Sequence, residues 1–317
     1  MIQTNTAIAV KGLKKSYKNL NVLKDIDFTV QKGSIFALLG SNGAGKTTTV
    51  KILTTLLLPD KGSPEICGFD VIRQPDQVRE KISLTGQSTA VDPVLTGREN
   101  LRMIGKLRHL PDANRQADEL LEQVQLLDAA DQKVATYSGG MQRRLDLAMG
   151  LIGGPSVIFL DEPTTGLDPQ SRKALWQIIK DLADSGITVF LTTQYLEEAD
   201  QLADHIAILN DGEIIAEGTA AELKKLLPHG HIELKFSDEK ELQLARNLLI
   251  QYNISLSKEN PTMTITTDGS IQQMTAILSQ LDHADITVTE FSQKKPTLED
   301  VFLAMIDENH GEENALC

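Results

Sequence analysis

Eight consecutive residues, Gly40 to Thr47, have the types and spacing needed to hold a chain of phosphates. They read Gly-Ser-Asn-Gly-Ala-Gly-Lys-Thr, which fits the pattern G-x-x-x-x-G-K-[ST]. Glycines at these positions let successive backbone N–H groups point into one concavity. Lys46 is expected to reach the β- and γ-phosphates, and the Thr47 hydroxyl to bind Mg²⁺. We predict that nine residues here bind a nucleotide: Gly40, Ser41, Asn42, Gly43, Ala44, Gly45, Lys46, Thr47 and Thr48.

The sequence on either side of this loop predicts the elements that position it. An apolar run at residues 35–39 predicts a buried strand, and residues 48–58 predict a helix. The amino end of that helix adds partial positive charge to the phosphate site. A Gly-rich turn alone would explain the glycines, but strand, loop and helix together are the P-loop arrangement. We therefore expect a nucleotide site.

Two adjacent carboxylates, Asp161 and Glu162, follow a second apolar run at residues 157–160. A strand covered on both faces would bring them to the edge of the sheet, beside the P-loop. There Asp161 would bind Mg²⁺, and Glu162 would act as the general base for an attacking water. A strand that simply ends in solvated acids explains this segment equally well when it is considered alone. The upstream P-loop favours the catalytic interpretation.

A second candidate anion site is formed by Ser138, Gly139 and Gly140, directly before a predicted helix at residues 141–152. A hydroxyl and two glycines at a helix amino end can hold an anion, although a Gly-Gly hinge would have the same sequence. One nucleotide gains little from two sites in one chain. If the second site faces the P-loop of a neighbouring copy, the nucleotide instead joins two chains.

These motifs together resemble the nucleotide-binding subunit of an ATP-binding cassette (ABC) transporter, over roughly residues 5–225. The resemblance implies an α/β fold, a P-loop NTPase ABC cassette with a RecA-like core, an antiparallel β subdomain and an α-helical subdomain at about residues 90–152. The matching motifs, in family terms, are Walker A at 40–47, Walker B at 157–162, the signature at 137–141, the D-loop at 166–168, the Q-loop residue Gln87, and Tyr17 as the ring that stacks on adenine.

The same resemblance implies a head-to-tail homodimer that binds two ATP molecules with Mg²⁺. Each ATP would lie between the Walker A loop of one chain and Ser138, Gly139 and Gly140 of the other. Gln87 would bind Mg²⁺ and sense the γ-phosphate, and Asp168 would reach across the dimer.

The chain departs from the family pattern at two positions. Met141 replaces the usual fifth glutamine of the signature, and Gln194 stands where the family places a histidine that contacts the γ-phosphate. Glutamine can donate one hydrogen bond there but cannot carry a proton or a charge. Hydrolysis would continue if the histidine only positions the phosphate, and would be slow if it relays a proton. Glu162, Gln87 and Gln194 are our candidate catalytic residues.

Gln194 with the residues around it, residues 95–100 and residues 296–303 also resemble the daunorubicin-resistance type of ABC ATPase. That resemblance implies drug or antibiotic efflux through a separate integral-membrane permease of the ABC-2 type. The ATPase would then lie peripherally on the cytoplasmic side of the cell membrane. Three alternatives remain: export of a lipid, polysaccharide or other non-drug substrate, a binding module with little hydrolysis, and a soluble ABC ATPase acting on ribosomes or DNA.

Composition narrows these alternatives. The net charge of −13 disfavours nucleic acid and anionic lipid as direct partners. No apolar run approaches the ~20 residues that span a bilayer, and the amino terminus has no signal-peptide pattern. Two cysteines in 317 residues indicate no disulfide framework. We therefore expect a protein that reaches a membrane by docking on another protein.

The order of predicted elements indicates a cassette at 1–228, a small α+β domain at 229–307 and a tail at 308–317. The second domain is predicted to have the ferredoxin-like order β-α-β-β-α-β, with a regulatory or dimerisation role. Predicted strands are 6–12, 20–30, 65–72, a strand ending at 86–87, 188–191, 205–209, 213–216, 231–236, 253–257, 262–267 and 285–291. Predicted helices are 97–130 with a break at 111–114, 170–184, 195–203, 219–227, 238–251, 270–282 and 297–306, with another beginning at 76.

Overall fold

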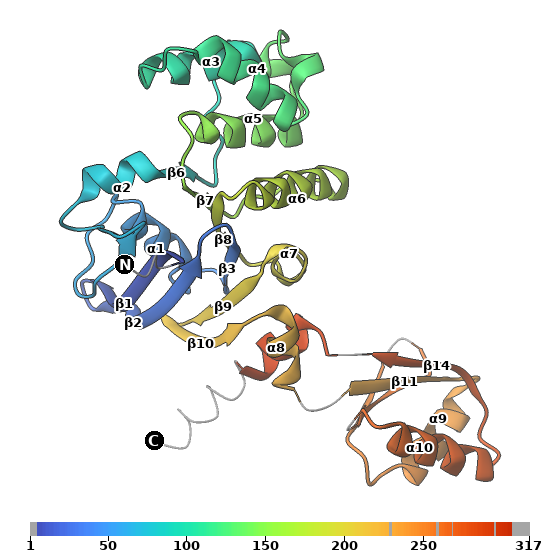
Figure 1. The fold of residues 1–317 in the computed structure, drawn as a ribbon. Helices are drawn as coiled ribbons and strands as arrows, with labels where there is room; N and C mark the ends of the chain where they lie inside the picture. Colours follow the sequence, from blue (N-terminus) through green and yellow to red (C-terminus); the bar gives the residue numbers. More distant parts are fainter. Residues whose placement is uncertain (1–4, 228–229, 258–259, 268, 295, 306–317) are drawn as a thin grey trace. The chain divides into compact units, whose positions relative to one another are not determined.

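The chain folds into two compact units, Met1–Ala220 and Ala221–Cys317, each with its own sheet core (Figure 1). The computed structural model describes residues 5–227, 230–257, 260–267, 269–294 and 296–305. The predicted boundary at 228–229 and the predicted tail at 308–317 lie outside these ranges, so both stay predictions.

A six-stranded sheet in the order β10-β9-β3-β8-β7-β6 forms the centre of the first unit. The strands β3, β9, β8, β7 and β6 run parallel, and only the edge strand β10 is antiparallel. Every residue of β3, β7 and β8 is buried, as expected for strands covered on both faces. Their bounds are β3 Ile35–Leu39, β6 Ile82–Thr85, β7 Val157–Asp161, β8 Thr188–Thr193, β9 His205–Asn210 and β10 Glu213–Gly218.

A smaller antiparallel sheet, in the order β2-β1-β4-β5, packs on this core. Its strands are β1 Thr6–Tyr17, β2 Leu20–Gln31, β4 Glu65–Ile66 and β5 Phe69–Asp70. The ring of Phe28 stacks on that of Phe36, with 5.3 Å between centroids. The predicted single strand at 65–72 is wrong. Cys67 and Gly68 take φ values of 53° and 84°, and this left-handed turn divides the segment into the hairpin of β4 and β5.

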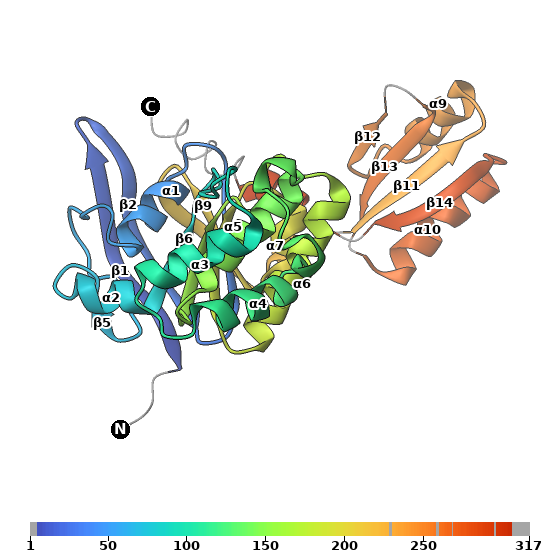
Figure 2. The ribbon, with the colours of Figure 1, turned by 90° about the horizontal axis from the view of Figure 1, so that it is seen from above.

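Helices lie between strands of the six-stranded sheet along the chain, and two of them, α6 and α7, lie side by side (Figure 2). The helices are α1 Lys46–Leu53, α2 Pro75–Lys81, α6 Pro169–Asp184 and α7 Leu196–Leu202. The predicted helix at 48–58 is too long, because Thr55 takes a φ of 64° just after α1 ends. Trp176, the only tryptophan, lies in α6 and is buried.

Three helices pack together as an α-helical subdomain: α3 Gly97–Leu107, α4 Ala113–Gln123 and α5 Gly139–Leu151. They lie together in Figure 1, away from the hairpin of β1 and β2. Thr96 caps α3 through a reciprocal pair of hydrogen bonds with Glu99. A break in the predicted helix 97–130 is confirmed, but it lies at residues 108–112 rather than 111–114, where His109 takes a φ of 54°. The predicted helix is also too long, because α4 ends at Gln123 and Gln125 takes a φ of 57°. Short 3₁₀ turns at Leu127–Ala129 and Val134–Thr136 lead into α5.

The second unit has a four-stranded antiparallel sheet in the order β12-β13-β11-β14, and α9 and α10 connect its strands in the order β-α-β-β-α-β, which confirms the ferredoxin-like prediction. The elements are α8 Ala220–Lys225, β11 Gly230–Phe236, α9 Glu239–Leu248, β12 Ile254–Leu256, β13 Thr262–Thr267, α10 Ile271–His283, β14 Val288–Lys294 and a final helical stretch at residues 298–305. Across the described residues of both units, no helix combines the length and the apolar character that crossing a bilayer requires.

Candidate nucleotide site

The Gly-rich loop between β3 and α1 forms one wall of a cavity of about 360 Å³. Gly43 and Gly45 take left-handed φ values of 87° and 114°, which only glycine adopts without strain. Gly40 is needed for a different reason, because a Cβ there would lie 2.3 Å from the carbonyl oxygen of Leu209. The cavity is lined by Val22, Asn42, Gly43, Gly45, Lys46, Thr47, Thr48, Gln87 and Glu162.

Lys46 is buried at the inner end of this loop. Its Nζ donates to the carbonyl oxygens of Gly40 (2.9 Å) and Ser41 (3.0 Å), and lies 3.5 Å from Oε1 of Glu162. Burial lowers the pKa of Lys46, and the negative charges of Glu162 and Asp161 partly offset that effect. The loop therefore presents an ammonium group directly beside the carboxylate predicted to act as the base.

Asp161, at the end of β7, is held between hydroxyl groups from two other elements. The Thr47 hydroxyl donates to its Oδ2 at 3.2 Å, and the Thr192 hydroxyl to its Oδ1 at 2.6 Å. Among the described residues, no three His, Cys, Asp or Glu side chains gather as a metal cluster. Mg²⁺ does not need one, since it takes one or two carboxylates together with phosphate oxygens and waters. The oxygens of Thr47 and Asp161, with Gln87 on the same cavity, fit that chemistry.

Glu162 has an unusual backbone for a non-glycine residue. Its φ is 47°, in the left-handed region, which costs an L-residue roughly 1–2 kcal/mol. Its N–H donates to both the carbonyl oxygen and the hydroxyl of Thr192, each at 3.1 Å. These bonds to β8 hold the strained residue so that its carboxylate lines the cavity.

Three residues that support this site were not predicted from the sequence: Thr192, Arg143 and Asp146. Thr192 is the second-last residue of β8, the strand beside β7, so its signal was a hydroxyl near the carboxyl end of a neighbouring buried strand. Arg143 and Asp146 are buried in α5. Their signal was a pair of opposite charges three residues apart on one helix.

The structure places the other predicted residues at different distances from the cavity. Gln87 lines the cavity and lies two residues after the end of β6. Tyr17 is the last residue of β1, is 46% exposed and lies outside the lining. Gln194 follows β8, is half-buried and also lies outside the lining. The roles of Tyr17 and Gln194 therefore stay predictions.

The Ser138-Gly139-Gly140 segment is the amino end of α5, and it too lies outside the cavity lining. The Ser138 hydroxyl caps the helix by accepting from Met141 N–H at 3.3 Å. A Cβ on Gly140 would lie 2.3 Å from the Ser171 hydroxyl, whereas one on Gly139 would meet no described atom within 4 Å. Packing within the chain therefore explains the glycine at 140 but not the one at 139.

Asp168 is the N-cap residue of α6. Its Oδ1 accepts from the N–H groups of Gln170 and Ser171, and its Oδ2 accepts from the Ser171 hydroxyl at 2.5 Å. Ser171 thus contacts both Asp168 and the segment at Gly140. The two predicted cross-dimer segments are neighbours, and both are separate from the P-loop cavity of their own chain.

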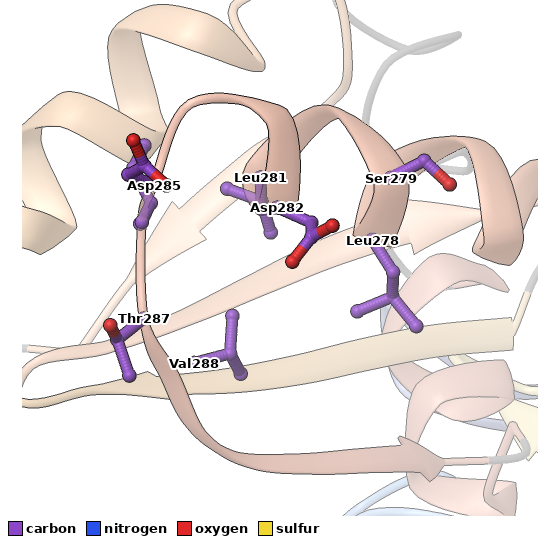
Figure 3. A pocket seen from close by; sticks show the side chains of 8 residues that line it. Leu278, Ser279, Leu281, Asp282, Asp285, Thr287 and Val288 are labelled. Atoms are coloured by element: carbon purple, nitrogen blue, oxygen red, sulfur yellow. The ribbon is translucent and has the colours of Figure 1, made fainter.

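A different cavity, of about 610 Å³, lies in the second unit between the end of α10 and the start of β14. Figure 3 shows Leu278 and Asp282 of α10 above Val288 of β14. Its polar lining residues are Ser279, Asp282, Asp285 and Thr287. With two carboxylates and no basic residue in its lining, this cavity does not suit a triphosphate.

Both units match models of known protein families. Residues 23–165 match the family model described as ABC transporter, and residues 218–306 match the one described as ATP-binding protein DrrA1-3-like, C-terminal domain. The chain is 44% identical over 301 residues to the daunorubicin resistance ATP-binding protein DrrA3 of Streptomyces coeruleorubidus, covering 94% of this chain and 95% of that protein. It is 34% identical to the linearmycin resistance ATP-binding protein LnrL of Bacillus subtilis (strain 168), covering 93% and 97%.

Solved structures give the same picture for the first unit. A dimeric ATP-binding cassette in a post-hydrolysis state, bound to ADP and Pi, superposes with a TM-score of 0.60 and 27% identity. The match covers 67% of this chain and 98% of that one.

Proposed function

This chain belongs to the ABC transporter family of ATP-binding proteins, in the daunorubicin-resistance group, and we propose that it hydrolyses ATP to drive export through a separate membrane subunit. One observation carries the catalytic half of this proposal. A buried lysine and a buried carboxylate, Lys46 and Glu162, lie 3.5 Å apart on one cavity that a Gly-rich loop encloses.

The residues of the cavity have different roles in the proposed hydrolysis of ATP. The loop N–H groups and Lys46 bind the β- and γ-phosphates of ATP and orient the bond that breaks. Glu162 accepts the proton of the water that attacks the γ-phosphorus, and the products are ADP and phosphate. Mg²⁺, held by Thr47, Asp161 and Gln87, would neutralise charge on the phosphate oxygens when it is bound. Gln194 donates a hydrogen bond to the γ-phosphate and so positions it.

A second copy of the chain completes each site. Support comes from Gly139, whose missing side chain leaves open space that nothing described in its own chain fills. A triphosphate on a partner's P-loop would take that space and meet the amino end of α5. Asp168, next to this segment through Ser171, would then lie near the partner's nucleotide. Adenine would stack on Tyr17 of the chain that supplies the P-loop.

For the transported molecule we propose a drug or antibiotic. The two relatives described above are resistance proteins, for daunorubicin and for linearmycin. The membrane partner is an ABC-2-type permease, and the ATPase docks on its cytoplasmic side. The net charge of −13 makes docking on a protein more favourable than adhesion to anionic lipid.

Two measurements test the proposal. The purified chain should release phosphate from ATP, and Glu162→Gln should lower turnover by roughly 100-fold or more, since it removes the general base. Unchanged turnover in that variant would refute the role of Glu162. In a drug-sensitive host, co-expression with a candidate ABC-2-type permease should confer resistance to daunorubicin that Glu162→Gln abolishes. Active ATPase without resistance would direct the search to a non-drug substrate.

A further inference from the structure

Arg143 of α5 joins two segments of the nucleotide site, residues 161–163 and Gly86, through one side chain. Its Nε donates to the carbonyl oxygen of Pro163 at 2.8 Å, its Nη2 to that of Asp161 at 3.3 Å, and its Nη1 to that of Gly86 at 2.5 Å. The side chain is buried, so these carbonyl groups depend on it rather than on water. Arg143 therefore fixes backbone far from it in the sequence.

The positions of those carbonyl groups are specific. Asp161 and Pro163 are the residues on either side of Glu162, whose φ of 47° is strained. Gly86 directly precedes Gln87. One guanidinium group therefore holds the backbone around the candidate base and beside the candidate γ-phosphate sensor. It contacts neither the cavity nor any group that would react, so it is a positioning residue.

Asp146 extends the same network. It lies one turn further along α5, with its Oδ2 at 3.4 Å from Nη1 of Arg143. Its Oδ1 accepts from the N–H of Ala90, three residues beyond Gln87. The segment around Gln87 is thus held to α5 on both sides of Gln87, at Gly86 and at Ala90.

The helix that carries this pair begins at Gly139, at the segment proposed to face the ATP of a second copy. Arg143 follows four residues later, about one helical turn away. We propose that Arg143, with Asp146, couples the two ATP sites of the dimer: movement around Gln87 and Glu162 in one site shifts α5, and α5 presents Ser138 and Gly139 to the other site. This inference rests on the dimer proposed above.

Arg143→Lys tests the proposal, because lysine keeps the positive charge but cannot reach three carbonyl groups from three nitrogens. Arg144→Lys is the matched control. Arg144 is the next residue, and its Nη1 donates to the carbonyl oxygens of Val124 and Gln125 in the helical subdomain. Asp146→Asn is the second variant, which weakens the network with less change to packing. The thermal melting of each full-length variant establishes that it folds.

The readouts are ATP affinity, measured with a fluorescent ATP analogue, and ATPase rate against ATP concentration. Wild type should show a Hill coefficient that approaches the number of sites, about 2. Arg143→Lys should bind ATP within about twofold of wild type, with a turnover roughly 10- to 100-fold lower and a Hill coefficient near 1. Asp146→Asn should shift the Hill coefficient in the same direction, and Arg144→Lys should leave it unchanged.

A Hill coefficient at the wild-type value in both Arg143→Lys and Asp146→Asn would overturn the coupling role, even if turnover falls. A fall in turnover alone is what a purely structural role would give. If wild type itself shows no cooperativity and no ATP-dependent dimer, the proposed dimer fails and the coupling proposal fails with it. The two failures are therefore distinguishable.

Discussion

The Nζ atom of Lys46 lies 3.5 Å from Oε1 of Glu162, and both side chains are buried. In the proposed mechanism each group is needed where it is, Lys46 for the phosphates and Glu162 for the attacking water. Their contact explains how a charged pair is tolerated inside the protein, because an opposite charge offsets part of the cost of burial. Nucleotide phosphates would offer Lys46 a stronger partner than a carboxylate and leave Glu162 free to act as a base.

Replacement of Lys46 should therefore affect ATP binding first. We expect Lys46→Met to raise the Kd for ATP by at least about tenfold, because a charge-assisted bond to phosphate is worth roughly 1.5–3 kcal/mol. Lys51→Met is the control, since Lys51 is exposed on the same helix. Calorimetric titration measures both. Equal ATP affinity in the two variants would contradict the assignment.

Variants of Gln194 distinguish two roles for the residue at this position, a hydrogen bond to the γ-phosphate and a proton relay. If the side chain only donates a hydrogen bond, Gln194→Ala should lower kcat by about 10- to 100-fold, and Gln194→His should retain most of it. The measurement is steady-state phosphate release across pH 6–9. A Gln194→His variant much faster than wild type would show that a proton relay is missing from this chain.

Tyr17 is predicted to be the platform for adenine. Tyr17→Ala should weaken ATP binding by roughly fivefold or more, since stacking of a base on an aromatic ring is worth about 1–3 kcal/mol. Tyr17→Phe keeps the ring and should bind ATP as wild type does. Tripolyphosphate, which lacks the base, should bind all three proteins equally. A loss of tripolyphosphate binding in Tyr17→Ala would instead indicate damage to the loop.

Buried Glu198 should make stability depend on pH. Burial raises the pKa of this carboxyl, although hydrogen bonds and the charge of Arg172 lower it in part, and its Oε1 accepts from Trp176 Nε1 at 3.1 Å. Because the folded pKa lies above the unfolded one, the folded state is favoured at low pH, and this stability is lost as pH rises through the folded pKa.

Glu198→Gln should remove that loss while still accepting the bond from Trp176. We expect its Tm to exceed that of wild type by at least about 2 °C at pH 8, with the difference shrinking toward pH 5. Fluorescence of Trp176, the only tryptophan, reports whether the contact survives. Glu197→Gln, an exposed neighbour, is the control. A difference that grows as pH falls would contradict the sign of the shift.

Local sequence was sufficient to predict the P-loop and most of the order of helices and strands. The apolar runs before Gly40 and Asp161 mark buried strands directly, and the β-α-β-β-α-β order of the second unit follows from alternating patterns. The prediction of one strand at 65–72 was wrong because Cys67 takes a left-handed conformation, which is uncommon for cysteine. Residue propensities do not predict such a turn when the pairing of strands in the folded protein sets it.

Contacts between distant segments could not be predicted in the same way. Arg143 reaches Gly86, 57 residues away, and Thr192 reaches Asp161, 31 residues away. Both depend on how α5 and β8 pack, which no local pattern encodes. Their residue types were visible in the sequence, but their partners were visible only in the fold.

We propose that a second copy of the chain closes over each nucleotide, and one measurement tests this dimer most directly. The Glu162→Gln chain should bind ATP without hydrolysing it, so light scattering after size exclusion should show its mass doubling when ATP and Mg²⁺ are added. Gly139→Asp should abolish that doubling in the same background, because the added carboxylate would repel the partner's triphosphate. Its side chain enters open space at a helix amino end, where an acid is tolerated. A Glu162→Gln chain that stays monomeric with ATP, or a double variant that still doubles in mass, would contradict the account.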